Sequence, residues 1–360
     1  MRDTPYLVVD EQVLQLNLTA MAAHAHKLGV SLRPHAKTHK SVEVARRQLA
    51  HGAIGLTLAT VAEAEVFANA GFNDIFIAYP VWAEGPRADR LRALARRVRL
   101  RVGVDSITSA RMLAHAATSG QHPAPLAVAI EVDSGHHRSG VAPDHAGAIA
   151  AAAAEYGLIV DGVFTYPGHS YALEARFSAA VQEAEALSAA SESLRELGME
   201  CPVVSGGSTP SAEASGGQAG PGVLTELRPG VYPFFDAQQW ELGTAGPERI
   251  ALTAVTTVVS MRDQQVIVDA GSKVLGADRA GYASGFGRLP AYPAARIVAL
   301  SEHHATIEWG QTATLPALGD RLRIAPNHVC TAVNLAADLI IERNGAEVAV
   351  WPVDARGANT

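Results

Sequence analysis

The chain has 360 residues, of which 48% are hydrophobic and 18% are charged, a balance that excludes disorder as its main state and suffices for a large core. Its formal net charge of -7 gives no reason to expect nucleic acid as a partner. The N-terminus has no basic segment followed by an apolar run, and no apolar run is long enough to cross a membrane. The two cysteines, Cys201 and Cys330, cannot form a disulfide framework, which suits a reducing compartment. Together these features lead us to expect a cytoplasmic protein without a membrane partner.

Apolar runs rich in β-branched residues alternate with amphipathic stretches from about residue 10 to residue 230. This alternation is typical of repeated βα units and a parallel sheet. Helical periodicity occurs at 91–98 and at 173–197, where Gly198 follows as a suitable helix end. We expect eight strands, at 31–37, 53–58, 74–78, 100–104, 126–133, 158–166, 202–205 and 223–227. They predict an α/β fold, a (β/α)8 TIM-type barrel with its chemistry at the C-terminal ends of the strands.

The pattern changes to strands and turns after about residue 240. Strands are expected at 254–260 and 265–270, and a second pair at 338–342 and 347–351 is joined by Asn-Gly, a strong hairpin signal. The extended N-terminal segment 5–9 is expected to pair with this part. The chain therefore divides into a barrel domain, 10–240, and a second, mostly β domain, 241–360 plus 1–9. The Ser- and Gly-rich stretch 211–222 is expected to form a mobile loop at the barrel mouth.

Four basic or titratable residues stand at alternate positions where the first predicted strand ends, in the string RPHAKTHK. Because side chains alternate along a strand, they would point to one side of it; they are Arg33, His35, Lys37 and His39. One interpretation is a solvated edge. The other is a lysine whose pKa is lowered by neighbouring cations, which allows it to form a Schiff base.

Two further strings follow predicted barrel strands. In TYPGHSY, the residues Tyr166, His169 and Tyr171 are expected at the barrel mouth, where His169 is either a general acid or base or a structural histidine. In SGGSTP, at 205–210, successive backbone N–H groups without bulky side chains would cradle a phosphate, unless the string is an ordinary turn.

The string PNHVC contains two metal-binding residue types, His328 and Cys330. Two residues apart on a strand, they would face the same way. Imidazole and thiolate suit zinc, and two protein ligands would leave positions open for water or substrate, as in catalytic sites. The alternative is a buried structural cysteine beside a surface histidine. We assign Cys201 to the core.

Six strings, TPYLVVD, PHAKTHK, EVDSGHHRSG, SGGSTP, LRPGVY and PNHVC, follow in this order over nearly the whole chain. Together they resemble the D-serine dehydratase and D-threonine aldolase family, whose barrel is like that of alanine racemase. The resemblance implies pyridoxal 5′-phosphate as cofactor, with Lys37 as its Schiff-base lysine. It also implies a divalent metal, zinc or manganese, on His328 and Cys330, and a homodimer.

The same resemblance implies the remaining cofactor contacts. Arg138 would face the phenolic oxygen of the cofactor, and Tyr171 would pack on the cofactor or hydrogen-bond to it. The other contacts are Gly207, Ser208, Thr209, Gly230 and Tyr232.

The resemblance implies a lyase acting on a D-β-hydroxy amino acid. In a dehydratase, Lys37 removes the Cα proton while the metal polarises the β-hydroxyl as a leaving group. The His-x-Cys pair and the GHSY string favour a D-serine dehydratase, which forms pyruvate and ammonia. D-Threonine aldolase, with His169 as base and glycine and acetaldehyde as products, is one alternative. D-3-Hydroxyaspartate dehydratase or aldolase is another, in which Arg33 and the basic neighbours of Lys37 would receive the second carboxylate.

Two different classes remain. A racemase needs a second base and no metal, so PNHVC argues against it. Pyridoxal-phosphate homeostasis proteins lack the β domain, so the length of chain after the eighth predicted strand argues against that class.

Overall fold

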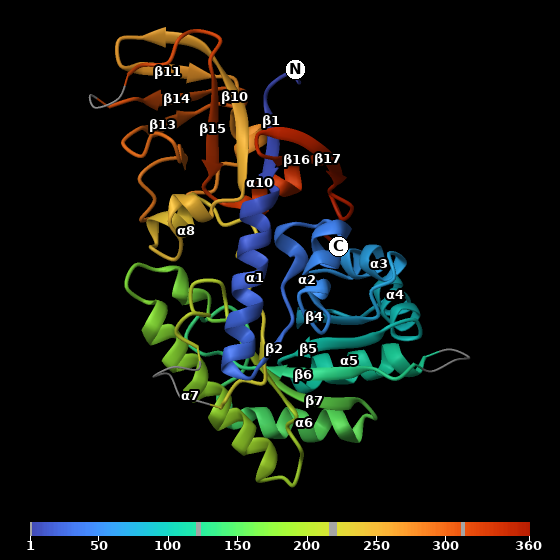
Figure 1. Cartoon of the computed structure of the whole chain (residues 1–360). Helices are drawn as coiled ribbons and strands as arrows, with labels where there is room; N and C mark the ends of the chain where they lie inside the picture. The colour runs from blue at the N-terminus through green and yellow to red at the C-terminus, as the bar shows by residue number, and fades with distance from the viewer. Residues whose placement is uncertain (1, 120–123, 216–221, 311–313) are drawn as a thin grey trace. The chain divides into compact units, whose positions relative to one another are not determined.

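The computed structural model describes residues 2–119, 124–215, 222–310 and 314–360 (Figure 1). The chain forms two compact units. The barrel unit comprises Ala22–Lys37, Ala45–Gly230 and Ala358–Thr360. The β unit comprises Met1–Met21, Thr38–Val44 and Val231–Gly357. The β unit thus includes residues 10–21, 38–44 and 231–240, which the sequence analysis assigned to the barrel domain.

Eight parallel strands form the barrel unit's sheet, in the order β2-β9-β8-β7-β6-β5-β4-β3. Each strand matches one of the eight expected runs, although β2 and β9 are only two residues long. Their bounds are β2 Ser31–Leu32, β3 Leu56–Leu58, β4 Asp74–Pro80, β5 Arg99–Val104, β6 Ala127–Glu131, β7 Ile159–Phe164, β8 Val203–Gly206 and β9 Glu226–Leu227. A parallel bridge between His35 and Thr57 joins the end strands, so the sheet closes. The predicted barrel with a mostly β second part is confirmed.

Among the described residues, six helices connect the strands and lie outside the sheet (Figure 1). Local signals start several of them: the Thr60 hydroxyl accepts from the N–H of Glu63, and Ser106 forms a capping box with Ser109. The longest helix ends before Gly198, which has the left-handed φ of 73° expected from the sequence. The helices are α2 Val42–Ala50, α3 Val61–Asn69, α4 Pro86–Ala95, α5 Ile107–Thr118, α6 Ala146–Glu155 and α7 Arg176–Arg195.

Aromatic and charged side chains fill the barrel interior. Phe76 and Phe164 pack edge to face around Ala129, with ring centres 5.0 Å apart. The Arg228 guanidinium lies over both rings, 5.5 and 5.2 Å from their centres. The small Ala129 side chain leaves the space that the two phenyl rings need.

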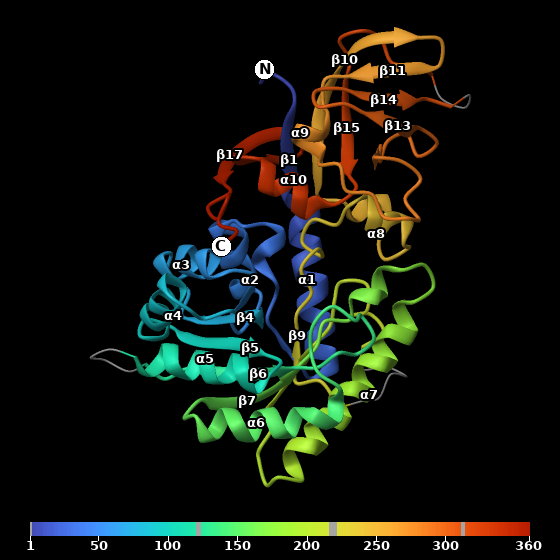
Figure 2. The same ribbon diagram turned by 180° about the vertical axis from the view of Figure 1, so that it is seen from behind.

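A nine-stranded sheet forms the β unit, mainly antiparallel, in the order β13-β14-β11-β10-β1-β16-β17 (Figure 2). Off this path, β15 pairs with β10, and β12 pairs with β15. The expected pairing of the N-terminal strand is confirmed, since β1 lies between β10 and β16. The strands are β1 Tyr6–Asp10, β10 Leu252–Arg262, β11 Gln265–Val268, β12 Gly287–Arg288, β13 Arg296–Leu300, β14 Ala305–Glu308, β15 Arg321–Pro326, β16 Asp338–Arg343 and β17 Ala346–Pro352. Both predicted hairpins form, and Asn344 and Gly345 have φ of 53° and 75° at the β16–β17 turn.

Helices also belong to the second part of the chain, where the sequence pattern indicated none of helical length. They are α8 Ala237–Glu241, α9 Ser272–Leu275 and α10 Val329–Leu335, and α1 Glu11–Leu28 begins in the β unit. All three later helices are too short for apolar periodicity to reveal them. No helix in the described residues is long and apolar enough to cross a membrane. Of the loop expected at 211–222, residues 216–221 lie outside the described part.

Candidate active site and metal centre

Lys37 lies in a single 3-10 turn, Ala36–Thr38, which begins shortly after the barrel strand β2 ends at Leu32. The strand ends at Leu32, so the expectation that four basic residues share one strand face is wrong. Regular pairing of β2 with β9 covers Ser31 and Leu32, and His35 then forms an isolated bridge to Thr57 of β3. Lys37 nevertheless follows the C-terminal end of a barrel strand, where this fold carries its chemistry.

Arg33 is occupied by ion pairs inside the barrel unit. Its guanidinium lies 2.6 Å from carboxylate oxygens of both Glu226 and Asp74, and only 1% of the residue is exposed. Burial alone would lower the pKa of Arg33, but the two carboxylates raise it above its ordinary value. This corrects the expectation that Arg33 receives a second substrate carboxylate, because its charge is already neutralised.

Three polar side chains surround the Tyr166 ring, and one of them, Lys37, is distant in sequence from the other two. The Lys37 Nζ lies 5.5 Å from the centre of the Tyr166 ring, and the Arg138 guanidinium lies 5.1 Å from it. The His136 ring meets the same ring edge to face at 5.5 Å. At Gly168, a Cβ atom would lie 2.5 Å from the His136 ring, so a larger residue there would displace this ring. The structure therefore brings Lys37 and Arg138 to one aromatic ring, as a cofactor site between them would require.

His169 presents one nitrogen that has no hydrogen-bond partner among the described residues. Its Nε2 lies 2.9 Å from Gln182 Oε1, and an amide oxygen only accepts, so this contact places the proton on Nε2. Its Nδ1 is buried and carries the lone pair. This arrangement fits the expected general base. Tyr171 ends the same 3-10 turn, Gly168–Tyr171, and is half-buried.

Three buried serines form a hydroxyl cluster at the predicted phosphate turn. The Ser208 Oγ lies 2.8 Å from Ser170 Oγ and 2.9 Å from Ser211 Oγ. The backbone N–H of Ser208 donates to Ser211 Oγ, and that of Gly207 donates to Glu183 Oε1. The hydroxyl groups, more than these two N–H groups, are therefore the donors that an anion would meet. Thr209, the next residue, is also buried.

Glycine shapes this turn, because Gly207 has a φ of 84° and a Cβ atom there would lie 2.6 Å from the Leu227 side chain. The small residues and clustered hydroxyls fit a phosphate group. Gly230 ends the long segment of the barrel unit, whereas Tyr232 is buried in the core of the β unit.

The sequence analysis expected His328 and Cys330 on a strand, and this expectation is wrong. Strand β15 ends at Pro326, His328 precedes helix α10, and Cys330 lies in its first turn. The helix begins here because Asp236 accepts from the N–H of Val329, at 3.1 Å. The two side chains still meet, since Cys330 hydrogen-bonds to His328.

Asp278 orients the His328 ring, a role that no sequence signal indicated. The His328 Nδ1 lies 2.8 Å from Asp278 Oδ2, which also accepts from the Thr331 hydroxyl at 2.8 Å. Metal-binding histidines commonly hold a carboxylate in this way, which leaves Nε2 for the metal. Burial alone would lower the pKa of His328, but Cys330, Asp236 and Asp278 raise it to about 10. Burial also raises the pKa of Asp236, to about 6.

The donor chemistry of this pair fits a divalent metal, although no group of three or more His, Cys, Asp or Glu side chains in the described ranges could hold one. Imidazole, thiol and a carboxylate behind the imidazole suit zinc with open positions. The metal on His328 and Cys330 stays a prediction.

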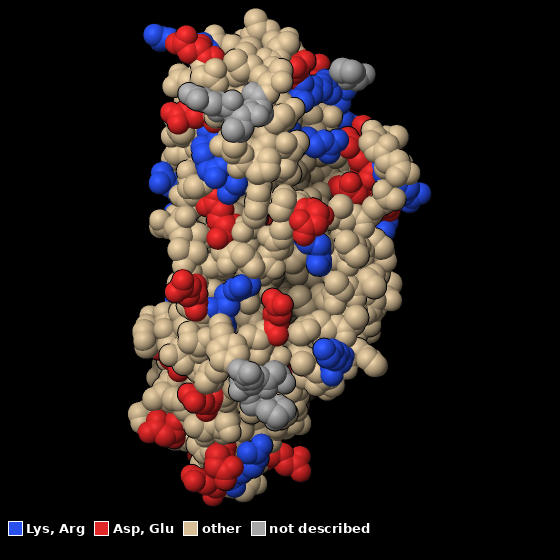
Figure 3. All heavy atoms as spheres, turned by 60° about the vertical axis from the view of Figure 1, so that its left-hand side comes forward, with Lys and Arg blue, Asp and Glu red and all other residues tan. Residues whose placement is uncertain are grey.

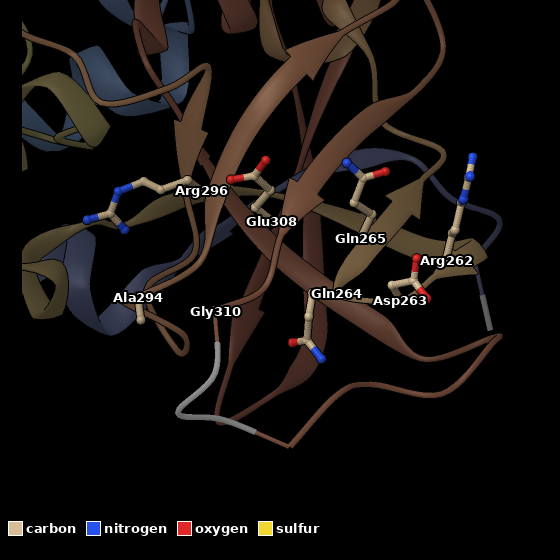
Figure 4. A pocket seen from close by; sticks show the side chains of 8 residues that line it. All are labelled: Arg262, Asp263, Gln264, Gln265, Ala294, Arg296, Glu308 and Gly310. Atoms are coloured by element: carbon tan, nitrogen blue, oxygen red, sulfur yellow. The ribbon is translucent and has the colours of Figure 1, made fainter.

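A cavity of about 690 Å³ also opens in the β unit, at the β10–β11 hairpin (Figure 4). Arg296 and Glu308 line one side of it, and Gln264 and Gln265 lie at the hairpin. The sequence analysis predicted no functional residue there. On the face shown in Figure 3, Lys and Arg are interspersed with Asp and Glu.

The alanine racemase N-terminal domain model matches residues 9–238, and a serine dehydratase domain model matches residues 251–341. The chain is 36% identical over 352 residues to D-threo-3-hydroxyaspartate dehydratase from Delftia sp. (strain HT23), covering 91% of each chain. It is 35% identical over 367 residues to D-threonine aldolase from Arthrobacter sp., covering 99% of this chain and 93% of the aldolase. The chain belongs to this alanine racemase-like family. The resemblance stated from the motifs is confirmed.

Solved structures agree with this assignment. D-Threonine aldolase from Filomicrobium marinum superposes with a TM-score of 0.89 at 33% identity, covering 99% of this chain and 97% of that one. Two variant structures of D-threo-3-hydroxyaspartate dehydratase also match, with TM-scores of 0.89 and 0.88 at 34% and 33% identity, each covering 98% of this chain and 97% and 95% of the other. One replaces a cysteine by alanine and is metal-free, and the other replaces a histidine two positions earlier.

Family membership confirms the predicted enzyme class, a lyase, and supports pyridoxal phosphate as its cofactor. The two curated relatives at 36% and 35% identity are named as a dehydratase and an aldolase, which favours a lyase over the racemase and the homeostasis protein. They are named for 3-hydroxyaspartate and threonine and not for D-serine, so they favour the alternatives over the expected D-serine dehydratase.

Proposed function

We propose that this chain is a pyridoxal-phosphate-dependent dehydratase of D-β-hydroxy amino acids, with D-threo-3-hydroxyaspartate as its first substrate. The observation that carries the proposal is the contact between His328 and Cys330. Their spacing equals that of the histidine and cysteine replaced in the two dehydratase variants, of which the cysteine variant is metal-free. The whole-chain similarity to that dehydratase supports the substrate.

Pyridoxal phosphate, when bound, supplies an electron sink for a bond broken at Cα. The residues around Tyr166 suit its ring, with Lys37 to hold it covalently and Arg138 to face it. The hydroxyls of Ser170 and Ser208 suit its phosphate. In the proposed reaction the Lys37 amine takes the Cα proton.

A divalent ion on His328 and Cys330 would polarise the β-hydroxyl. Asp278 keeps the imidazole in the tautomer and orientation that this requires. The Cβ–O bond then breaks, and the hydroxyl leaves with a proton as water. Hydrolysis of the remaining carbon–nitrogen bond gives a keto acid and ammonia, which balances the reaction.

D-Threonine aldolase is a second candidate, favoured by the buried Nδ1 of His169, which has no hydrogen-bond partner among the residues that the structure describes. In that reaction this nitrogen takes the proton of the β-hydroxyl, and the Cα–Cβ bond breaks. The products are glycine and acetaldehyde.

A product assay by proton NMR tests the proposal. Purified protein with pyridoxal phosphate and zinc or manganese is offered D-threo-3-hydroxyaspartate, D-threonine and D-serine in separate tubes. Oxaloacetate and ammonia from the first substrate support the dehydratase. Glycine with acetaldehyde from D-threonine would show an aldolase instead. Pyruvate from D-serine, with no product from the other two substrates, would support the D-serine dehydratase expected from the sequence. The homodimer also remains a proposal, which sedimentation velocity tests.

A further inference from the structure

Glu183 is a buried carboxyl group that the proposed reaction does not use. It lies on helix α7 with only 1% of its surface exposed. Its Oε1 accepts from the backbone N–H of Gly207 at 2.5 Å. Its other oxygen, Oε2, is buried and has no hydrogen-bond partner within the described part of the chain.

Two adjacent glycines allow this close approach. At Gly206, a Cβ atom would lie 2.3 Å from Oε1 of Glu183, and Gly207 holds a left-handed φ of 84°. The side chain thus reaches the backbone of the phosphate turn from the helix layer, at a point that any larger residue would block. The contact fixes the residue immediately before Ser208, whose hydroxyl belongs to the serine cluster.

Burial disfavours the ionised form of Glu183, and its two polar neighbours oppose burial only in part. Among the neighbouring groups, the Gly207 N–H and the buried Arg228 favour a carboxylate, but Arg228 also donates to Ser205 Oγ and to the Thr165 carbonyl. A phosphate group would bring a further charge of about −1.5 to −2 to the turn. A neutral acid avoids that repulsion and still accepts from Gly207.

We propose that Glu183 is a positioning residue for the phosphate turn, which it holds through Gly207, and that it is neutral when the cofactor phosphate is bound. The inference rests on the proposed function, because it takes the phosphate to be that of pyridoxal phosphate. Burial of Glu183, only partly offset by Gly207 and Arg228, raises its pKa to about 7, which agrees with a proton held near neutral pH.

The test measures the Kd for pyridoxal phosphate by fluorescence titration between about pH 6 and pH 8. It compares the wild type with Glu183→Gln, which is neutral at every pH and keeps an acceptor for Gly207, and with Glu183→Ala. The control is Glu185→Gln, an exposed change on the same helix. Taking the ratio of Kd values for the wild type and Glu183→Gln cancels the titration of the cofactor and of Lys37.

We expect the wild type and Glu183→Gln to bind alike at about pH 6. At about pH 8 the glutamine variant should bind about 10-fold more tightly, because the wild type must first take up a proton. Glu183→Ala should bind at least about 10-fold more weakly than the wild type at the lower pH, because the turn loses its support.

Three results would overturn the inference. Equal weakening in both variants would mean that the ionised carboxylate is required. Tighter binding by Glu183→Ala would mean that the carboxyl group competes with phosphate for Gly207. A ratio of Kd values for the wild type and Glu183→Gln that does not change with pH would show that cofactor binding does not require a neutral Glu183. A wild type that does not bind pyridoxal phosphate would instead refute the proposed function, so the two failures are distinguishable.

Discussion

The Cys330 sulfur lies 3.2 Å from the hydroxyl oxygen of Thr38, the residue that directly follows Lys37 in the chain. A hydroxyl group at this distance can stabilise a metal-bound sulfur, as outer partners of metal ligands commonly do. Thr38→Val keeps the shape of the side chain and removes the hydroxyl. We expect zinc affinity to fall about 10-fold, measured by competition with a chromophoric chelator. Thr306→Val, on β14 of the same unit, is the control, and equal affinities would show that Thr38 has no such role.

The two cysteines allow a matched test of the metal site. Cys330→Ala removes a proposed ligand, so the variant should retain the cofactor spectrum and lose its chelator-sensitive activity. Cys201→Ala removes a thiol that lies 3.6 Å from Ser191 in the barrel unit, and its activity should remain sensitive to chelators. Activity is measured with and without a chelator. Full activity in Cys330→Ala would refute the metal on this pair.

Lys37→Ala should abolish the absorbance band of the lysine-bound cofactor, because no amine remains at that position to form the bond. The control is Lys27→Ala, which changes an exposed lysine of α1 and should keep the band. Absorbance spectra of the two variants with added pyridoxal phosphate are compared. An unchanged spectrum in Lys37→Ala would show that another lysine binds the cofactor.

His169→Gln separates the two candidate reactions. If Nδ1 of His169 is the base that an aldolase requires, glycine formation from D-threonine should fall at least about 100-fold. Keto acid formation should change little, because that route uses Lys37. Product ratios by NMR check this, with His145→Gln, an exposed histidine, as control. Equal losses of both products would assign His169 a structural role.

Glu183 predicts a pH dependence of stability that does not involve the cofactor. Burial raises its pKa from 4.5 to about 7 in the folded chain. The folded state therefore binds more protons than the unfolded state over that range, and its stability falls as the pH rises from about 4.5 to about 7. Relative to Glu183→Gln, the wild type should lose up to about 3 kcal/mol of unfolding free energy over this range. Urea unfolding of both cofactor-free proteins measures the difference, and parallel curves would contradict the assigned titration.

Local sequence signals determined most of the fold. All eight barrel strands and both hairpins formed where apolar alternation and turn residues predicted them, because side-chain periodicity reflects which face of an element is buried. The six ordered motifs also identified the family, which the comparisons confirmed. Short elements were predicted less well. The first barrel strand was predicted too long, since β2 ends at Leu32, and helix α10, which begins within PNHVC, was missed.

Only the tertiary structure decided which side chains meet. Asp278 and His328 are 50 positions apart, and Glu183 and Gly207 are 24 apart, yet each pair forms a hydrogen bond. Arg33, one of the four basic residues at alternate positions of its string, proved to be neutralised by Glu226 and Asp74. Residue type and spacing determined that Lys37, His169, His328 and Cys330 were candidates. Their partners depended on how strands and helices pack, because hydrogen bonds and ion pairs between distant residues form only where that packing brings the atoms together.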